Sequence, residues 1–92
     1  MTRLWPFGLA ISVTGTGDGG GNGGDRTRPI SFSWHNQTHR VDEITREWRV
    51  DIDWWRGRVW RDYFKLSTDT GLLVIIYRDL LSGEWYLQRL YD

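Results

Sequence analysis

A glycine-rich run, Thr14–Asp25, divides the chain and limits its fold most strongly, since it holds most of the 11 glycines. Such a segment cannot bury enough apolar surface to offset the conformational entropy that it would lose on folding. We therefore expect residues 1–28 to be a flexible tail and residues 29–92 to form one small domain. The apolar piece Leu4 to Val13 ahead of the run is expected to be disordered or loosely packed, or to act as a docking peptide.

The stability of the domain must come from packing. The chain of 92 residues has no cysteine, which excludes disulfides and thiolate zinc sites. It does have seven tryptophans and an aromatic content of 15%. Each large ring can bury roughly 150–250 Å², which at about 25 cal/mol/Å² stabilises a fold by at most about 4–6 kcal/mol. A few such rings are sufficient to hold a small sheet together.

The formal net charge is zero, with 12 basic and 12 acidic residues. This balance argues against a protein that coats nucleic acid by bulk charge, because that mode depends on many uncompensated cations. A local basic strip is compatible with it, and so is an ordinary mixed-charge surface. Nearly all of the cations are arginines, which suit stacking and bidentate contacts better than lysine does, and Lys65 is the single lysine.

No segment has the length of a membrane span. The longest apolar run, Leu72 to Tyr77, is far shorter than the roughly 20 residues required. The N-terminus has one positive charge followed by an apolar stretch, but Pro6 interrupts this stretch and no site of the signal-peptidase type follows. We therefore expect a cytoplasmic protein without membrane contact.

From Pro29 the pattern is typical of β structure. Ile30 and Phe32 begin an alternation of apolar residues with serines, as in a half-buried strand, and residues 35–38 are expected to form a turn. Residues 39–50 permit two interpretations, because their apolar positions recur three and four apart, as on a helix face, while the segment lacks an N-cap and ends in β-favouring residues. We favour a long strand with a bulge, or two short strands, followed by a connection over 51–57 that ends at a glycine.

The last third predicts three further strands, over residues 59–66, 72–78 and 84–91. Glycine-containing turns at 67–71 and 79–83 join them into an antiparallel meander.

The fold class predicted is all-β, or mainly β, with an antiparallel sheet of about five strands. A sheet of this size must bend or cover its edges to avoid pairing with another copy, so we expect it to be strongly bent or barrel-like. In the final strand we expect Trp85, Leu87 and Tyr91 on one face and Tyr86 and Leu90 on the other.

Residues suited to catalysis or metal binding do not assemble into a recognisable site. Asp51 and Asp53 would share one face of a strand, but nothing marks them as an acid–base pair. His35 and His39 flank the expected turn without an obvious third metal ligand. No nucleophile stands beside a base and an orienting group. We therefore expect a protein that is not an enzyme and uses no cofactor and no metal.

Tryptophan and arginine are interleaved between residues 48 and 61. Exposed indole rings and guanidinium groups stack on unpaired bases or on a partner's aromatic side chains, and both residue types are enriched at binding hot spots. The simpler interpretation is structural: the tryptophans fill the core and the adjacent arginines point outward. We favour the simpler interpretation for Trp48, Trp60 and Trp85.

The tandem pair Trp54 and Trp55 is different, because adjacent residues of an extended chain cannot both face inward. One of the two rings is therefore expected to be partly exposed. Our hypothesis is a partner-binding surface that comprises Trp54, Trp55, Arg56, Arg58, Arg61 and Tyr63. A protein partner is the leading interpretation, single-stranded nucleic acid is the alternative, and a sugar or small-molecule site is a third.

Several motifs occur in a defined order, namely Asp53-Trp-Trp-Arg-Gly57, Arg61-Asp-Tyr-Phe64, Ile76-Tyr-Arg-Asp79, Gly83-Glu-Trp-Tyr-Leu87 and Leu90-Tyr-Asp92. This series resembles the C-terminal module of ImuB-like proteins, which are inactive relatives of Y-family translesion polymerases, and it resembles the bacterial domain-of-unknown-function family 6504. The resemblance covers about residues 29–92. It implies a bacterial protein that is an accessory to DNA repair or translesion synthesis through contacts with a component of a DNA-repair complex.

The residues that match this pattern are Trp54, Trp55, Arg61, Asp62, Tyr63, Tyr77, Arg78 and Trp85. The resemblance does not say which of them touch a partner, and Arg61 with Asp62 is alternatively a structural ion pair. The chain contains no polymerase-like body, so what the resemblance implies is restricted to the module.

Overall fold

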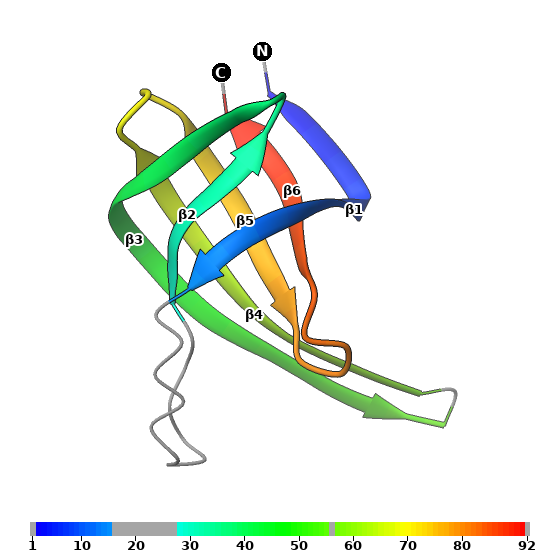
Figure 1. Ribbon diagram of the computed structural model, residues 1–92. Coiled ribbons are helices and arrows are strands. Elements are labelled where there is room, and N and C mark those ends of the chain that lie inside the picture. The colour runs from blue at the N-terminus through cyan, green and yellow to red at the C-terminus, as the bar shows by residue number, and fades with distance from the viewer. Residues whose placement is uncertain (1, 16–27, 56, 92) are drawn as a thin grey trace.

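The computed structural model describes residues 2–15, 28–55 and 57–91, except for the side chain of Trp54. Every helix or strand assigned within these ranges is a β-strand (Figure 1). The strands are β1 (Arg3–Gly15), β2 (Pro29–Trp34), β3 (Gln37–Trp54), β4 (Gly57–Thr68), β5 (Leu73–Asp79) and β6 (Trp85–Tyr91). No helix long and apolar enough to cross a bilayer occurs in this part of the chain.

The six strands follow one another around a closed antiparallel barrel. Each strand pairs with its neighbours in the sequence, and β1 also pairs with β6, so that the ring closes without a crossover. The expected all-β, barrel-like fold is confirmed. The barrel contains one strand more than the five that were expected.

The additional strand is β1, which lies in the segment that we expected to be a flexible or loosely packed tail. One half of β1 pairs with β2 and the other half pairs with β6. Trp5, Ile11 and Val13 pack against the barrel core. The expectation was wrong for residues 3–15 because the partners that stabilise this strand lie far away in the sequence, and local pattern does not report them. Residues 16–27 of the expected linker lie outside the described residues.

The core consists of side chains that alternate along the strands and point into the barrel. Its buried cluster comprises Phe32, Phe64, Leu66, Val74, Ile76, Trp85, Leu87 and Leu90. Phe64 and Trp85 lie in contact, with ring centroids 5.7 Å apart. All of these residues belong to β2, β4, β5 and β6, so β1 and β3 contribute only partly buried apolar side chains to the core.

The β2–β3 hairpin turns within two residues, His35 and Asn36, inside the expected turn 35–38. Their φ angles are 53° and 58°, the left-handed backbone that a tight type I′ hairpin turn requires at both central positions. Trp34 and Gln37 pair directly on either side of the turn, and the His35 ring stacks on Trp34 with centroids 4.0 Å apart.

β3 is one long strand, which confirms the interpretation as a strand with a bulge. Its register with β4 shifts between Val41 and Glu43 and again between Ile44 and Arg46, and the strand curves strongly (Figure 1). The extra residue explains why the partly buried Val41 and Ile44 are three apart, a spacing that resembled a helix face. The expected connection over 51–57 was wrong, because pairing with the start of β4 continues β3 to Trp54.

β6 also contains a bulge. Ile75 lies opposite Arg89 and Ile76 lies opposite Leu87, so one additional residue is inserted between Leu87 and Arg89. A bulge changes which residues face the core. Leu90 is therefore buried in the core. The expected placement of Leu90 on the face of Tyr86, and of Tyr91 on the face of Trp85 and Leu87, was wrong for this reason.

β1 approaches the barrel wall closely at Gly8. The register between β1 and β6 shifts between Leu4 and Leu9, and Gly8 has a φ of 78°. A Cβ at this position would lie 2.5 Å from Oη of Tyr77 and 2.8 Å from Cβ of Tyr86. Both the left-handed backbone and the close approach to the two tyrosines therefore require glycine.

Replacing Gly8 by alanine is expected to destabilise the fold more than replacing Gly71 by alanine. Gly71 shares the left-handed backbone, with a φ of 89°, but a Cβ there would meet nothing within 4 Å. Both substitutions incur the backbone cost of about 1–2 kcal/mol, and Gly8→Ala adds overpacking of about 1–3 kcal/mol. Urea unfolding curves measure the difference, and equal stabilities of the two variants would contradict the close packing of Gly8 on the tyrosines.

Candidate interaction surface

The β3–β4 hairpin extends beyond the barrel as a two-stranded arm (Figure 1). β4 pairs with β5 only from Arg61 onward, so the strand pairing described for residues 50–59 is between β3 and β4 alone. We call residues 50–59 the arm. Four of the six predicted site residues lie in it, namely Trp54, Trp55, Arg56 and Arg58.

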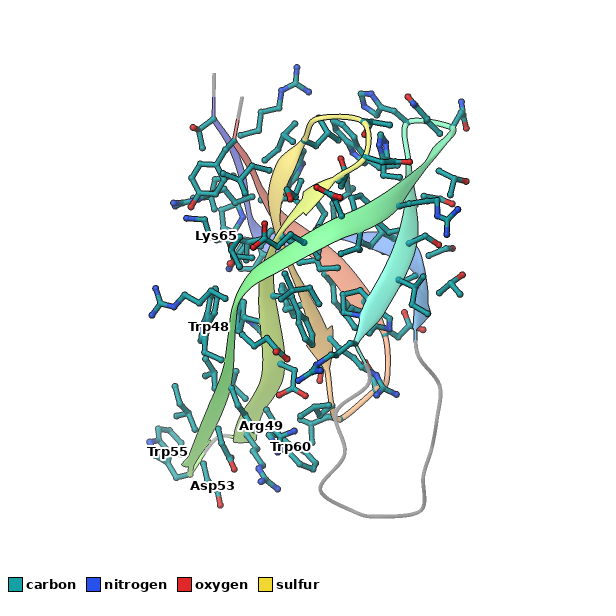
Figure 2. All side chains as sticks on the ribbon, turned by 90° about the vertical axis from the view of Figure 1, so that its left-hand side faces the viewer. Trp48, Arg49, Asp53, Trp55, Trp60 and Lys65 are labelled. Carbon is teal, nitrogen blue, oxygen red and sulfur yellow. The ribbon has the colours of Figure 1, made fainter. Side chains whose placement is uncertain are left out.

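Strand alternation gives the hairpin two faces with different chemistry. Figure 2 shows Trp48 and Lys65 on one side of the β3–β4 ribbon and Arg49 and Trp60 on the other. The face of Trp60 leads along β4 to the buried Phe64, so we call it the inner face. The face of Trp48 is the outer face.

Two bidentate ion pairs cross the hairpin on the inner face. Arg58 donates to both carboxylate oxygens of Asp51, each at 3.0 Å. Arg49 donates to both carboxylate oxygens of the buried Asp62, at 2.7 and 3.0 Å. Both guanidinium groups lie over the Trp60 ring, with Cζ of Arg58 at 4.4 Å and Cζ of Arg49 at 5.9 Å from the ring centroid. These contacts tie β3 to β4.

The ion pairs also set the electrostatics of the inner face. The hydrogen bond from Arg58 lowers the pKa of Asp51 below its ordinary value. The hydrogen bond to Asp62 raises the pKa of Arg49. Asp51 and Arg49 therefore stay ionised near neutral pH, and the positive charges of both arginines are compensated within the hairpin.

The outer face of the arm is apolar. Val50 and Val59 are half-buried there, and Ile52 is 53% exposed. Trp55 lies in the turn at the tip of the arm (Figure 2), and 83% of it is exposed. A projecting hairpin with an apolar face and an exposed indole at its tip has the chemistry of a contact surface.

The structure divides the predicted site residues into separate groups. Arg58 lies on the inner face of the arm, whereas Arg61 and Tyr63 lie on the outer face of the barrel, where Arg61 donates a 3.2 Å hydrogen bond to Oη of Tyr63. Residues 58 and 61 are three apart, so they point to opposite sides of the strand. Trp55 is exposed at the tip. The side chain of Trp54 and all of Arg56 lie outside the described residues.

Two tryptophans that were expected in the core lie on the surfaces of the hairpin. Trp48 stacks on Tyr63 on the outer face, with ring centroids 5.2 Å apart and an interplanar angle of 6°. Trp60 is half-buried beside the arginines of the inner face. Both lie outside the buried core cluster, and only Trp85 of the three confirms the expectation.

Sequence reasoning missed the ion pairs of the inner face because the hairpin register was not fixed. Asp62 pairs with Arg49 across the hairpin, whereas its neighbour Arg61 points to the other face. The order of the charged residues did contain a signal. A turn centred between residues 55 and 56 places Arg49 opposite Asp62 and brings Arg58 near Asp51. These pairs can be predicted only when the position of the turn is known, and the expected connection over 51–57 did not define it.

A cavity of about 610 Å³ opens elsewhere on the barrel, between β1, the β2–β3 turn and the β5–β6 turn. Its lining includes Ser12, Trp34, His35, Glu84 and Trp85, and none of the predicted site residues. Within the ranges that the structure covers, no group of three histidine, aspartate or glutamate side chains could hold a metal ion. The cavity is therefore separate from the arm.

A family model described as a domain of unknown function, DUF6504, matches residues 10–92. The chain belongs to this family. The matched region begins within β1, so part of the strand that closes the barrel belongs to the DUF6504 domain.

The DUF6504 chain is also similar to Protein ImuB of Caulobacter vibrioides, in strains NA1000 / CB15N and ATCC 19089 / CB 15. Each relative is 30% identical over 78 residues, which cover 68% of this chain and 17% of ImuB. The chain thus spans a small part of the length of these relatives. The resemblance to ImuB-like proteins and to the 6504 family is confirmed. No solved structure matches the chain.

Arg58→Gln is expected to move the pKa of Asp51 back up toward its ordinary value of 3.8. Because this pKa is lowered in the folded arm, the ion pair stabilises the arm above the ordinary value and is lost as the pH falls through the lowered pKa. A carboxyl ¹³C NMR titration measures the shift. Arg40→Gln, which removes a cation outside the arm, should leave the pKa unchanged. An unshifted Asp51 in Arg58→Gln would contradict the ion pair.

Proposed function

We propose that this DUF6504 protein is a non-catalytic interaction module of the bacterial cytoplasm that is an accessory to DNA repair or translesion synthesis. In this proposal the arm binds a protein component of the repair complex. The observation that carries it is Trp55, which is 83% exposed at the tip of the arm. Tryptophan is among the residue types most enriched at binding hot spots, because its ring buries a large area on contact.

The construction of the arm supports this role. Ile52 adds an exposed apolar side chain on the outer face, next to the tip. The ion pairs Arg58–Asp51 and Arg49–Asp62 hold the two strands together on the inner face. A hairpin that is already ordered loses less conformational entropy on binding than a flexible loop does. More of the contact energy then contributes to affinity.

The paired arginines favour a protein partner over single-stranded nucleic acid at the arm. The guanidinium groups of Arg49 and Arg58 each hold a carboxylate in bidentate geometry, so a phosphate would have to displace Asp62 or Asp51. On the outer face Val50, Ile52 and Val59 are apolar, and the cation beside them is Arg61, opposite Val50. The arm therefore suits an apolar anchor better than a phosphate backbone.

The similarity to ImuB supports the repair context. ImuB-like proteins are inactive relatives of translesion polymerases, and their region beyond the polymerase-like body is associated with contacts to other members of the mutagenesis complex. The present chain matches 17% of the length of ImuB. We assign it the contact role of that module and not the role of the polymerase-like body.

Trp55→Ala is expected to reduce capture of the partner at least about tenfold, which corresponds to a loss of about 1.4 kcal/mol. The immobilised chain is incubated with lysate from bacteria exposed to DNA damage, and bound proteins are quantified by mass spectrometry. Phe7→Ala is the matched control, since Phe7 is 92% exposed on β1, outside the arm. Circular dichroism establishes that both variants are folded.

Different outcomes separate the two parts of the proposal. Equal capture by the wild type and Trp55→Ala would remove the arm as the binding site. Equal losses in Trp55→Ala and Phe7→Ala would indicate adsorption to any exposed ring and would also contradict it. If the bound proteins include none of the DNA-repair machinery, the repair context is wrong while the role of the arm stands.

A further inference from the structure

Two rows of side chains cross the outer face of the barrel from β3 to β6. The strand register aligns one aromatic row, Trp48, Tyr63, Tyr77 and Tyr86. It aligns a second row, Arg46, Lys65, Ile75 and Arg89. We call these the aromatic row and the cationic row. They are neighbours on one face, because on β3, β4 and β5 their members are two residues apart, or about 7 Å.

The aromatic row is a continuous series of ring contacts. Ring centroids are 5.2 Å apart between Trp48 and Tyr63, and 5.1 Å apart between Tyr63 and Tyr77. The contact between Tyr77 and Tyr86 is 5.2 Å. The two central tyrosines are buried, while Trp48 and Tyr86 at the ends are half-buried. The row is therefore a packed aromatic series in which only the end rings, Trp48 and Tyr86, are partly accessible.

The cations of the second row rest on aromatic rings. Cζ of Arg46 lies 5.0 Å from the centroid of Trp48. Nζ of Lys65 and Cζ of Arg89 lie 5.1 and 5.6 Å from the centroid of Tyr91. Among the residues that the structure describes, none of these three cations has a carboxylate within 4.0 Å. Within the described ranges the three charges thus have no ion-pair partner, although the full sequence has a formal net charge of zero.

The carboxylates of the outer face do not interrupt the cationic row. Glu43 lies in the flanking row opposite Ser67, and Asp79 lies beyond the aromatic row opposite Arg61. Cζ of Arg61 lies 4.6 Å from the centroid of the Tyr77 ring. The contrast with the inner face is clear, because there both described arginines of the hairpin hold aspartates.

We propose that this outer face binds single-stranded nucleic acid, with phosphates along the cationic row and unpaired bases against the exposed parts of Trp48 and Tyr86 at the ends of the aromatic row. Cations neutralise phosphates, while aromatic rings and guanidinium planes stack on bases of any sequence. The guanidinium of Arg46 over Trp48 offers such a plane. A duplex conceals the faces of its bases, and an acidic peptide would leave the aromatic row without a partner. A single strand uses both rows.

Fluorescence anisotropy of a labelled 20-nucleotide oligo-dT tests the proposal with the whole chain, over a series of salt concentrations. The test variant combines Arg46→Gln, Lys65→Gln and Arg89→Gln, which keep polar side chains of similar length. We expect binding at low salt to weaken at least tenfold. The slope of log affinity against log salt should become shallower by about 2, since each phosphate contact contributes about 0.7 for single strands. Arg40→Gln is the matched control and should bind as the wild type does.

Circular dichroism establishes that the triple variant is folded. If it is not, Lys65→Gln alone replaces it, with an expected slope change of about 0.7. The proposal is overturned if oligo-dT does not bind at low salt, or if the variants bind with the affinity and slope of the wild type. It is also overturned if Arg40→Gln weakens binding as much as Lys65→Gln, or if poly-glutamate or a 20-base-pair duplex competes as well as oligo-dT. Weaker competition by both supports it.

Discussion

The register of the β3–β4 hairpin is the constraint on which the other features of the structure depend. It places Arg49 opposite Asp62 and Asp51 opposite Trp60, so that the bidentate ion pairs form on one face only. It also places Trp48 opposite Tyr63, which begins the aromatic row on the other face. A slip of one residue in either strand would exchange the faces, burying charges and exposing rings, so the side-chain contacts themselves select the register.

The closed barrel keeps this hairpin in place. Bulges near the start of β3 let the strand leave β2 and continue along β4, and β1 completes the ring between β2 and β6. Gly8 allows β1 to lie directly on Tyr77 and Tyr86, so the end of the aromatic row is fixed by a strand from the opposite end of the chain. The outer face therefore depends on closure of the barrel by the pairing of β1 with β6, whereas the arm depends only on the pairing of β3 with β4.

The two proposals assign different chemistry to different surfaces. The arm compensates its arginines internally and presents Trp55 and Ile52, which suits an apolar protein contact. The outer face holds Arg46 and Lys65 over aromatic rings, and neither has a carboxylate partner among the residues that the structure describes, which suits a polyanion with stacking groups. A module with both surfaces could hold a repair protein and a single strand together, although each surface is tested independently of the other.

The sequence by itself determined the all-β class, the strands β2, β4, β5 and β6, most of the turns and the exposure of one ring of the Trp54–Trp55 pair, because these follow from local alternation, turn residues and adjacency along an extended chain. For residues 39–50 it favoured a strand but left a helix open, and it did not predict that β3 continues to Trp54. Tertiary structure decided that residues 3–15 join the barrel and that Leu90 points inward. Each of these depends on which distant strand supplies the partner and on where a bulge shifts the alternation by one residue. Local pattern contains neither quantity, since both are set by packing between segments far apart in the chain.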